Sequence, residues 1–226
     1  MAEQIAKSKV EDAELVERRR AQLTAAAIAT FSEKGYHVAT IRDVAKRAGV
    51  SIGLIYQYVQ DKEDLLFLAL LDVLESYRRT IPVALEGVVD PLLRFQVAVE
   101  TYCRVNAANV DATVLAYRET KSLRKERRNI IKQKEVETNE IIASTVRECI
   151  AAGYFVADLD IEMFTYQIVM LCHAWALKAW RFRSRMSVDE YLQRGLRLLY
   201  AAALTARGER QLRAAGPRQE GKEDPT

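Results

Sequence analysis

The sequence has 226 residues, of which 50% are apolar, and only nine Gly and four Pro. A chain of this size can bury a core, which excludes disorder of the whole chain, and abundant Ala, Leu, Glu, Arg and Lys predict helix almost throughout. The formal charge of +3 is small, but eight cations against three acidic residues give the stretch from Arg18 to Lys62 a local balance of +5. We therefore expect an all-α protein with a weakly basic N-terminal zone.

Cysteine use and hydropathy narrow the class of protein further. Cys103, Cys149 and Cys172 are odd in number, far apart and never paired as C-x-x-C, which argues against a disulfide framework and a zinc site. No N-terminal stretch resembles a signal peptide, and no run approaches the ~18 apolar residues that a bilayer span needs. The sequence predicts a cytoplasmic protein with no membrane partner, no metal and no cofactor.

Capping signals divide the first third of the chain into short helices. A long helix that begins near residue 10 is expected to stop at Gly35, where a C-terminal glycine usually stands. Thr40 and Asp43 form a capping box that predicts a helix over 41–48. Further caps are expected at Ser51 and Asp61.

Longer helices are expected in the rest of the chain. The first is expected to end near Pro82, because proline rarely continues a helix. Asp90 before Pro91 is a cap followed by proline at the first helical position, and Asp158 or Asp160 caps a later helix. These helices span about 61–80, 91–108, 110–121, 125–152, 160–183 and 187–207, which gives about nine in all. The last of them opens with a second capping box, Ser187 with Glu190.

The residues around Gly49 fit a helix-turn-helix. Counting from Ile41, this motif needs a small side chain at the fifth position, where the helices touch, and glycine at the ninth, where the backbone turns left-handed. Ala45 and Gly49 stand at these positions. The apolar positions that pack the pair against the first helix are Val44, Ala48, Val50 and Ile55. The motif predicts that the helix starting at Ser51 enters the major groove of DNA.

Candidate DNA contacts flank this turn. The candidates for base edges, at the start of the second helix, are Ser51, Ile52 and Gly53. The candidates for phosphates are Arg42, Tyr56, Tyr58 and Lys62. The alternative is an ordinary helical hairpin with a basic, solvated face.

The segment FSEKGYHVATIRDVAKRAGVSIGLIYQYVQDKEDLL, residues 31–66, resembles the DNA-binding segment of the TetR/AcrR family of bacterial transcriptional regulators. The matching positions are Phe31, Gly35, Thr40, Ala45, Ala48, Gly49, Val50, Ser51, Tyr56, Tyr58, Lys62 and Glu63. Leu54 and Val59 depart from the pattern, which often has threonine and usually phenylalanine there. The resemblance implies that the protein is a homodimer in which Thr40, Tyr56 and Lys62 bind phosphates. It places Ser51, Ile52, Gly53 and Gln57 nearer to bases.

The stretch FTYQIVMLCHAWALKAW, residues 164–180, is apolar around most of a helix, so it must be covered on two sides. The resemblance implies that the last two helices pair with their symmetry mates in a four-helix bundle. A two-fold dimer sets two recognition helices about one DNA turn apart, so the operator should be palindromic.

A catalytic site is not expected. Cys172 and His173 are adjacent, and neighbours on a helix point about 100° apart, so they cannot form a nucleophile and base pair. The only other histidine is His37, and the chain has no G-x-S-x-G, phosphate-binding glycine loop or H-E-x-x-H motif. The sequence does not predict an enzyme.

Apolar and aromatic residues of the central helices are candidates for an effector pocket, although each fits the core equally well. The candidates are Phe95, Val99, Tyr102, Leu115, Tyr117, Ile141, Thr145, Met170, His173 and Trp175. The stretches at 117–128 and 173–183 resemble ligand domains of family members that control the degradation of fatty acids or related acyl-CoA esters. An acyl-CoA joins an apolar tail to anionic phosphates, so the resemblance adds Arg118 at the mouth of an aromatic tunnel. A drug or an aromatic compound is the alternative ligand.

The predicted protein is thus a homodimeric repressor that binds a palindromic double-stranded DNA operator and is released by a small hydrophobic effector. Its DNA-binding domain is expected at 10–60, its ligand-binding and dimerisation domain at 61–207, and a disordered polar tail at 208–226. A transcriptional activator of the same fold is one alternative. A helical protein-interaction module without a role on DNA is another.

Overall fold

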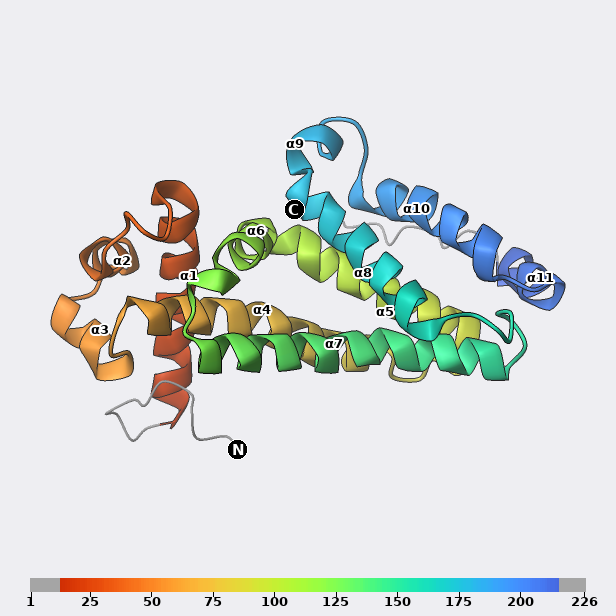
Figure 1. Ribbon diagram of the computed structural model, residues 1–226, viewed down its shortest axis with the longest axis horizontal. Helices are drawn as coiled ribbons and strands as arrows, with labels where there is room; N and C mark the ends of the chain where they lie inside the picture. The colour runs from red at the N-terminus through yellow and green to blue at the C-terminus, as the bar shows by residue number, and fades with distance from the viewer. Residues whose placement is uncertain (1–12, 216–226) are drawn as a thin grey trace, which may run out of the picture.

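Three helices around two capped turns form one end of the molecule in the computed structural model, which describes residues 13–215 (Figure 1). They are α1 (Ala13–Lys34), α2 (Ile41–Ala48) and α3 (Ile52–Tyr58). Thr40 and Asp43 make both bonds of the expected capping box, and Ser51 Oγ accepts from the backbone N–H of Leu54. Side-chain caps therefore set where these short helices begin, as predicted.

The body of the protein is built from longer helices. They are α4 (Lys62–Ala84), α5 (Pro91–Ala108), α6 (Val110–Glu119), α7 (Lys125–Ala151), α8 (Ile161–Leu177), α9 (Ala179–Phe182), α10 (Val188–Ala203) and α11 (Ala206–Ala215), with a 3-10 turn at Thr120–Ser122. In Figure 1, α4 and α7 run side by side along the long axis, while α8 and α10 lie together on one side of the body. The all-α prediction is confirmed. Among the described residues, no helix is both long and apolar enough to cross a membrane.

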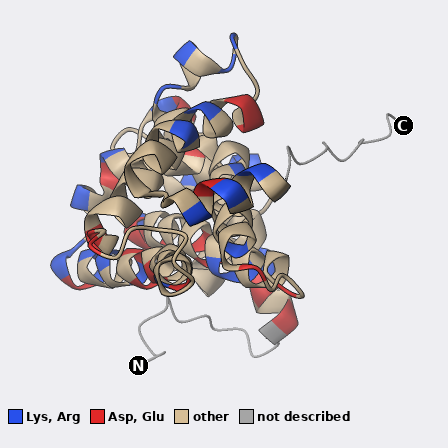
Figure 2. Cartoon of the chain, turned by 90° about the vertical axis from the view of Figure 1, so that its right-hand side faces the viewer, with Lys and Arg blue, Asp and Glu red and all other residues tan. Residues whose placement is uncertain are grey.

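Two cores meet on α4. Residues 65–70 of α4 pack with α1, α2 and α3, while Val73, Tyr77 and Ile81 belong to the core formed with α5, α7, α8 and α10. The fourth helix therefore contributes to both cores. Seen from the end farther from α3, the body mixes both signs of charge (Figure 2).

α4 ends at Ala84, so the helix runs through Pro82 and slightly past the expected end near that proline. Proline lacks an N–H and its ring crowds the carbonyl four residues earlier, but Pro82 lies in the last turn, where little of the helix remains to be disrupted. The N–H of Leu85 closes that turn on the carbonyl of Ile81 at 3.1 Å.

The single helix expected over 160–183 is two helices, with a break at Lys178, whose φ and ψ are −120° and 28°. The Phe182 ring stacks on Trp175 with 6.3 Å between centroids and packs against Tyr191. Asp160, rather than Asp158, caps α8.

The C-terminal boundary also differs from the prediction. The last expected helix ends at Ala203 instead of near 207, and residues 206–215, most of which were assigned to the disordered tail, form α11. Thr205 starts this helix by accepting from the N–H of Gly208 at 3.1 Å. Leu212 packs on the body, and Gln211 donates to Asp90 at 3.0 Å. The apolar contact was missed because one leucine among charged residues gives little periodic signal. The remainder of the expected tail lies outside the described residues.

Candidate nucleic-acid interface and internal cavity

The turn between α2 and α3 has the geometry that the sequence predicted. Gly49 has φ of 67°, and its N–H donates to Lys46 while the N–H of Val50 donates to Ala45 at 3.0 Å. This pair of bonds closes the end of α2 around a left-handed residue. The Gln22 side chain of α1 donates to the carbonyl of Ala48 at 2.9 Å, which fixes α2 on α1.

One face of α3 points to solvent. Its exposed residues, together with the cap, are Ser51, Gly53, Tyr56 and Gln57, while Ile52 is half-buried. A Cβ built on Gly53 would meet only Ser51 Oγ within 4 Å, at 3.9 Å. Because glycine destabilises a helix interior by roughly 0.5–1 kcal/mol relative to alanine, and the described neighbours leave room for alanine, the fold alone does not require it.

A shallow hollow beside α3 gathers three of the expected phosphate ligands, Thr40, Arg42 and Tyr56. It is lined by Thr40, Ile41, Arg42, Ile52 and Tyr56, so residues from both sides of the turn converge there. Tyr56 is 48% exposed, and Arg42 is exposed as well. The ammonium of Lys34 lies 2.6 Å from Asp43, and this contact holds the pKa of Asp43 well below its usual range. Asp43 therefore stays ionised as part of the cap.

Two expected phosphate contacts are placed differently. Tyr58 is only 2% exposed and packs in the core beneath α3, unlike the exposed Tyr56. On a helix of 3.6 residues per turn, Tyr58 lies on the side opposite the exposed Tyr56. The Lys62 ammonium donates to the carbonyls of Tyr36, His37 and Ala39 at 2.8, 3.1 and 3.0 Å. Its three protons therefore hold the loop before α2.

A cavity of about 250 Å³ lies in the body between α4, α5, α6, α7 and α8. Its lining residues are Leu70, Val73, Leu74, Tyr77, Tyr102, Thr113, Ala116, Tyr117, Thr120, Ile131, Lys132, Glu135 and His173. Of the candidate ligand residues, the cavity contains Tyr102, Tyr117 and His173. The wall is mostly apolar and aromatic, which suits a small hydrophobic molecule.

The polar part of the wall centres on His173. The Tyr102 hydroxyl lies 3.0 Å from Nε2 and the Tyr117 hydroxyl 2.8 Å from Nδ1. Burial lowers the pKa of His173 to about 4, so the ring is neutral at pH 7 and has one donor and one acceptor nitrogen. If the buried Tyr102 donates to Nε2, then Nδ1–H donates to Tyr117. The Tyr117 proton is then directed at Met170 Sδ, 3.8 Å away, or at a ligand.

Charged residues of α7 complete the wall, and the sequence reasoning did not select them. Burial raises the pKa of Glu135, against the opposing effect of Lys132 one turn away. Ile131 and Glu135 are spaced by four residues and face the cavity together. The sequence signal that could have identified Glu135 is its place four residues after Ile131, a spacing typical of the apolar face of a helix.

The remaining candidate ligand residues do not line this cavity. The buried ones are Phe95, Val99, Leu115, Thr145 and Trp175, a burial that fits a place in the core. Ile141 is half-buried and packs against the same core. Met170 is 41% exposed on α8, and Arg118 is exposed on α6. An apolar helical pattern does not distinguish cavity walls from core, which is why these were indistinguishable in the sequence.

Two family models match the chain. Residues 23–69 match the model of bacterial regulatory proteins of the tetR family, and residues 89–183 match a tetracyclin repressor-like C-terminal domain. The HTH-type transcriptional regulator HbdR of Aromatoleum sp. (strain CIB) is 50% identical over 203 residues, which cover 90% of this chain and 88% of that protein.

Solved structures share the fold. A bacterial regulatory protein in the tetR family from Rhodococcus RHA1 superposes with a TM-score of 0.73 at 24% identity, over 83% of this chain and 97% of that one. The regulator FadR from Bacillus subtilis, solved in complex with stearoyl-CoA, superposes with a TM-score of 0.68 at 20% identity, over 80% of this chain and 97% of that one.

Proposed function

Because the chain belongs to the tetR family and is a DNA-binding transcriptional regulator, we propose that it acts as a homodimeric repressor that a small hydrophobic effector releases from a palindromic operator. The observation that carries this proposal is the exposed face of α3 beside the hollow formed by Thr40, Arg42 and Tyr56. Ser51, Gly53 and Gln57 lie toward base edges, and the hollow takes a phosphate. This division follows how helix-turn-helix proteins read DNA.

The outer face of α8 and α10 supports the homodimer. Met163, Met170 and Leu198 are exposed by 58%, 41% and 76%, which leaves apolar side chains unburied along two neighbouring helices. Gly195 brings α10 close to α8, since a Cβ there would lie 2.5 Å from Leu171. A second copy related by a two-fold axis would bury this face and set two α3 helices on one side of a duplex.

We propose the cavity around His173 as the effector site and an acyl-CoA as the effector class. FadR of Bacillus subtilis, which shares the fold, was solved with stearoyl-CoA. The aromatic wall suits an acyl group, and Lys132 supplies a positive charge for the anionic part. The volume, about 250 Å³, lies just below the usual range of small-molecule sites, ~300–1,000 Å³. Chains of several lengths are therefore the useful probes.

Release follows from linkage. The cavity touches α4 at Leu70, Val73 and Tyr77, and the same helix begins at Lys62, beside the loop that carries Thr40. An effector that prefers a shape in which the two α3 helices misfit the operator weakens DNA binding by the same factor by which DNA weakens effector binding.

The test uses labelled duplexes that together cover the DNA upstream of the protein's own coding sequence. Fluorescence anisotropy measures the binding of the protein to each duplex. One duplex should bind better than a scrambled duplex of the same composition, and the logarithm of affinity should fall linearly with that of salt. Butyryl-, octanoyl- and stearoyl-CoA are then added separately, and at least one should release the DNA. Equal affinity for every duplex rejects the operator proposal, and release by none of the three rejects the effector class.

A further inference from the structure

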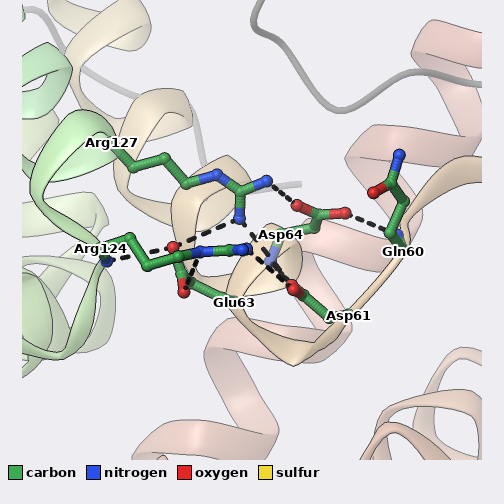
Figure 3. Close-up of polar contacts among 6 residues, drawn as sticks. All are labelled: Gln60, Asp61, Glu63, Asp64, Arg124 and Arg127. Atoms are coloured by element: carbon green, nitrogen blue, oxygen red, sulfur yellow. Dashed lines mark hydrogen bonds and ion pairs between the residues drawn. The ribbon is translucent and has the colours of Figure 1, made fainter.

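The corner between α3 and α4 is held from outside the N-terminal unit. Gln60 lies between Val59, which ends α3, and Asp61, which caps α4. The backbone N–H of Gln60 donates to one oxygen of the Asp64 carboxylate at 2.5 Å, and the other oxygen accepts from the Arg127 guanidinium of α7 (Figure 3). One carboxylate thus joins the backbone of the corner to α7.

Burial makes this connection strong. Asp64 is 0% exposed and Arg127 18%, so solvent screens their pair weakly. Removing Arg127 leaves the buried Asp64 charge without its cation. Arg127 also lies 3.5 Å from Glu63 and 3.8 Å from Asp61, so it keeps these longer contacts when Asp64 is replaced. Arg127 also lies over the Phe67 ring, 5.4 Å from its centre, which fixes the direction of its side chain.

Arg124 adds weaker contacts at the same corner. It lies 2.9 Å from Asp61 and 2.8 Å from Glu63, and both contacts are drawn in Figure 3. The Arg124 side chain is 58% exposed, so water and salt screen these pairs. The corner therefore depends mainly on Arg127.

The face of α7 that carries Arg127 also reaches the cavity. Arg127, Ile131 and Glu135 follow one another at intervals of four residues, which places them on one side of the helix. Ile131 and Glu135 line the cavity. A ligand that displaces this part of α7 therefore also displaces the residue that holds the corner.

We propose that Arg127 is a positioning residue for DNA binding. Through Asp64 and Gln60 it sets the angle between α3 and the body, and it is the point at which α7 transmits occupancy of the cavity to α3. This inference rests on the proposed function, in which α3 enters DNA. Arg127 acts through Asp64 and does not itself bind DNA. The DNA phosphates bind instead at the hollow formed by Thr40, Arg42 and Tyr56.

The test variant is Arg127→Met, which keeps an apolar side chain against Phe67. Its matched control is Lys125→Met, which removes one positive charge from an exposed position on the same turn of α7. Both variants change the net charge equally, so any difference in DNA binding cannot come from the overall field. Asp64→Asn is the second variant, because it keeps the size of the side chain and an acceptor for Gln60. Arg127→Lys tests rescue by a conservative cation.

We expect Arg127→Met and Asp64→Asn to weaken binding to the upstream duplexes at least about tenfold relative to Lys125→Met, under conditions where circular dichroism shows every variant folded. The salt dependence of affinity should keep its slope, because a positioning residue neutralises no phosphate. The double variant should bind no more weakly than the worse single one, since both changes break one connection. Arg127→Lys should recover part of the loss.

Hydrogen–deuterium exchange of residues 58–66 gives a readout that does not need DNA. Exchange there should rise in Arg127→Met and stay unchanged in Lys125→Met. If Arg127→Met binds DNA as Lys125→Met does, or if its salt slope falls by about one contact, ~0.9, the positioning role is wrong. If the wild-type protein prefers no duplex, the proposed function fails, while unchanged exchange in Arg127→Met separately rejects the hold on the corner.

Discussion

The ammonium of Lys62 lies 2.8 Å from the carbonyl oxygen of Tyr36 and 4.6 Å from the centre of the Tyr36 ring. Residue 36 precedes α2 and residue 62 begins α4, so the contact ties together both ends of the helix-turn-helix. His37 and Ala39 offer two more carbonyls to the same ammonium. Lys62 therefore supports the loop that carries Thr40 to the hollow beside α3.

This placement predicts that Lys62→Met weakens folding as well as DNA binding. Hydrogen bonds to a charged group contribute ~1.5–3 kcal/mol, so the free energy of unfolding should fall by about 1–3 kcal/mol. Urea denaturation measures the loss, and Lys46→Met, at an exposed position of α2, serves as the control. If Lys62 acted only as a phosphate ligand, the variant would bind DNA more weakly with unchanged stability.

Tyr56 and Tyr58 form a matched pair for a second test. Tyr56 is 48% exposed at the hollow, and Tyr58 is 2% exposed beneath it. Tyr56→Phe should weaken DNA binding by roughly 5- to 10-fold, the equivalent of one hydrogen bond, and leave the melting temperature unchanged. Tyr58→Phe should leave DNA affinity unchanged. Anisotropy titrations of both proteins decide the matter, and equal losses in the two variants would contradict the assignment.

These contacts mark the limit of what the sequence predicts. The caps made by Thr40 and Ser51 and the turn at Gly49 use hydrogen-bond partners no more than four residues away. Spacing in the sequence alone therefore predicts them. Lys62 reaches carbonyls 23 to 26 positions earlier, and no local pattern encodes that partner. Its match to the family pattern located the residue, while its carbonyl partners are known only from the structure.

The cavity also combines residues that the sequence predicts with residues that it does not. A tyrosine and histidine cluster among apolar helices was predictable, and Tyr102, Tyr117 and His173 do meet at the cavity. Lys132 and Glu135 were missed because charged residues on a long helix usually face water. Which face of α7 turns inward is decided by its packing against α4 and α5, and that packing joins segments far apart in the chain.

Two glycines should respond in opposite ways to substitution by alanine. Gly49 has φ of 67°, so Gly49→Ala should lower the free energy of unfolding by roughly 1–2 kcal/mol. Gly53 lies in α3 without a positive φ and with open space around it, so Gly53→Ala should stabilise the fold by up to ~1 kcal/mol. The same change should weaken DNA binding, because the methyl group stands where the backbone approaches the groove. Denaturation and anisotropy on the two variants separate these effects. Unchanged DNA affinity in Gly53→Ala would mean that α3 does not approach DNA at this residue.

His173 predicts a specific dependence of stability on pH. Its pKa is lowered from 6.5 to about 4 by burial, so between these values the unfolded chain binds a proton that the folded chain does not. Stability from this group is therefore complete above pH 6.5 and is lost as pH falls toward 4, by at most about 3 kcal/mol. Urea denaturation at pH 7.5, 6, 5 and 4.5 measures the slope, and His173→Gln should flatten it. An identical slope in the variant would show that other groups account for it.

Leu198 tests the proposed dimer. It is 76% exposed on α10, where a monomer gains nothing from an apolar side chain, and it lies on the helix that packs tightly against α8 through Gly195. Leu198→Glu places two like charges near a two-fold axis and removes apolar burial, so sedimentation velocity should show a monomer where the wild-type protein is a dimer. A monomer meets only one half of a palindrome, so its operator affinity should fall while its salt slope drops toward half. Val38→Glu, 76% exposed on the loop between α1 and α2, gives the same charge away from the dimer face. A dimer that survives in Leu198→Glu would place the interface on another surface.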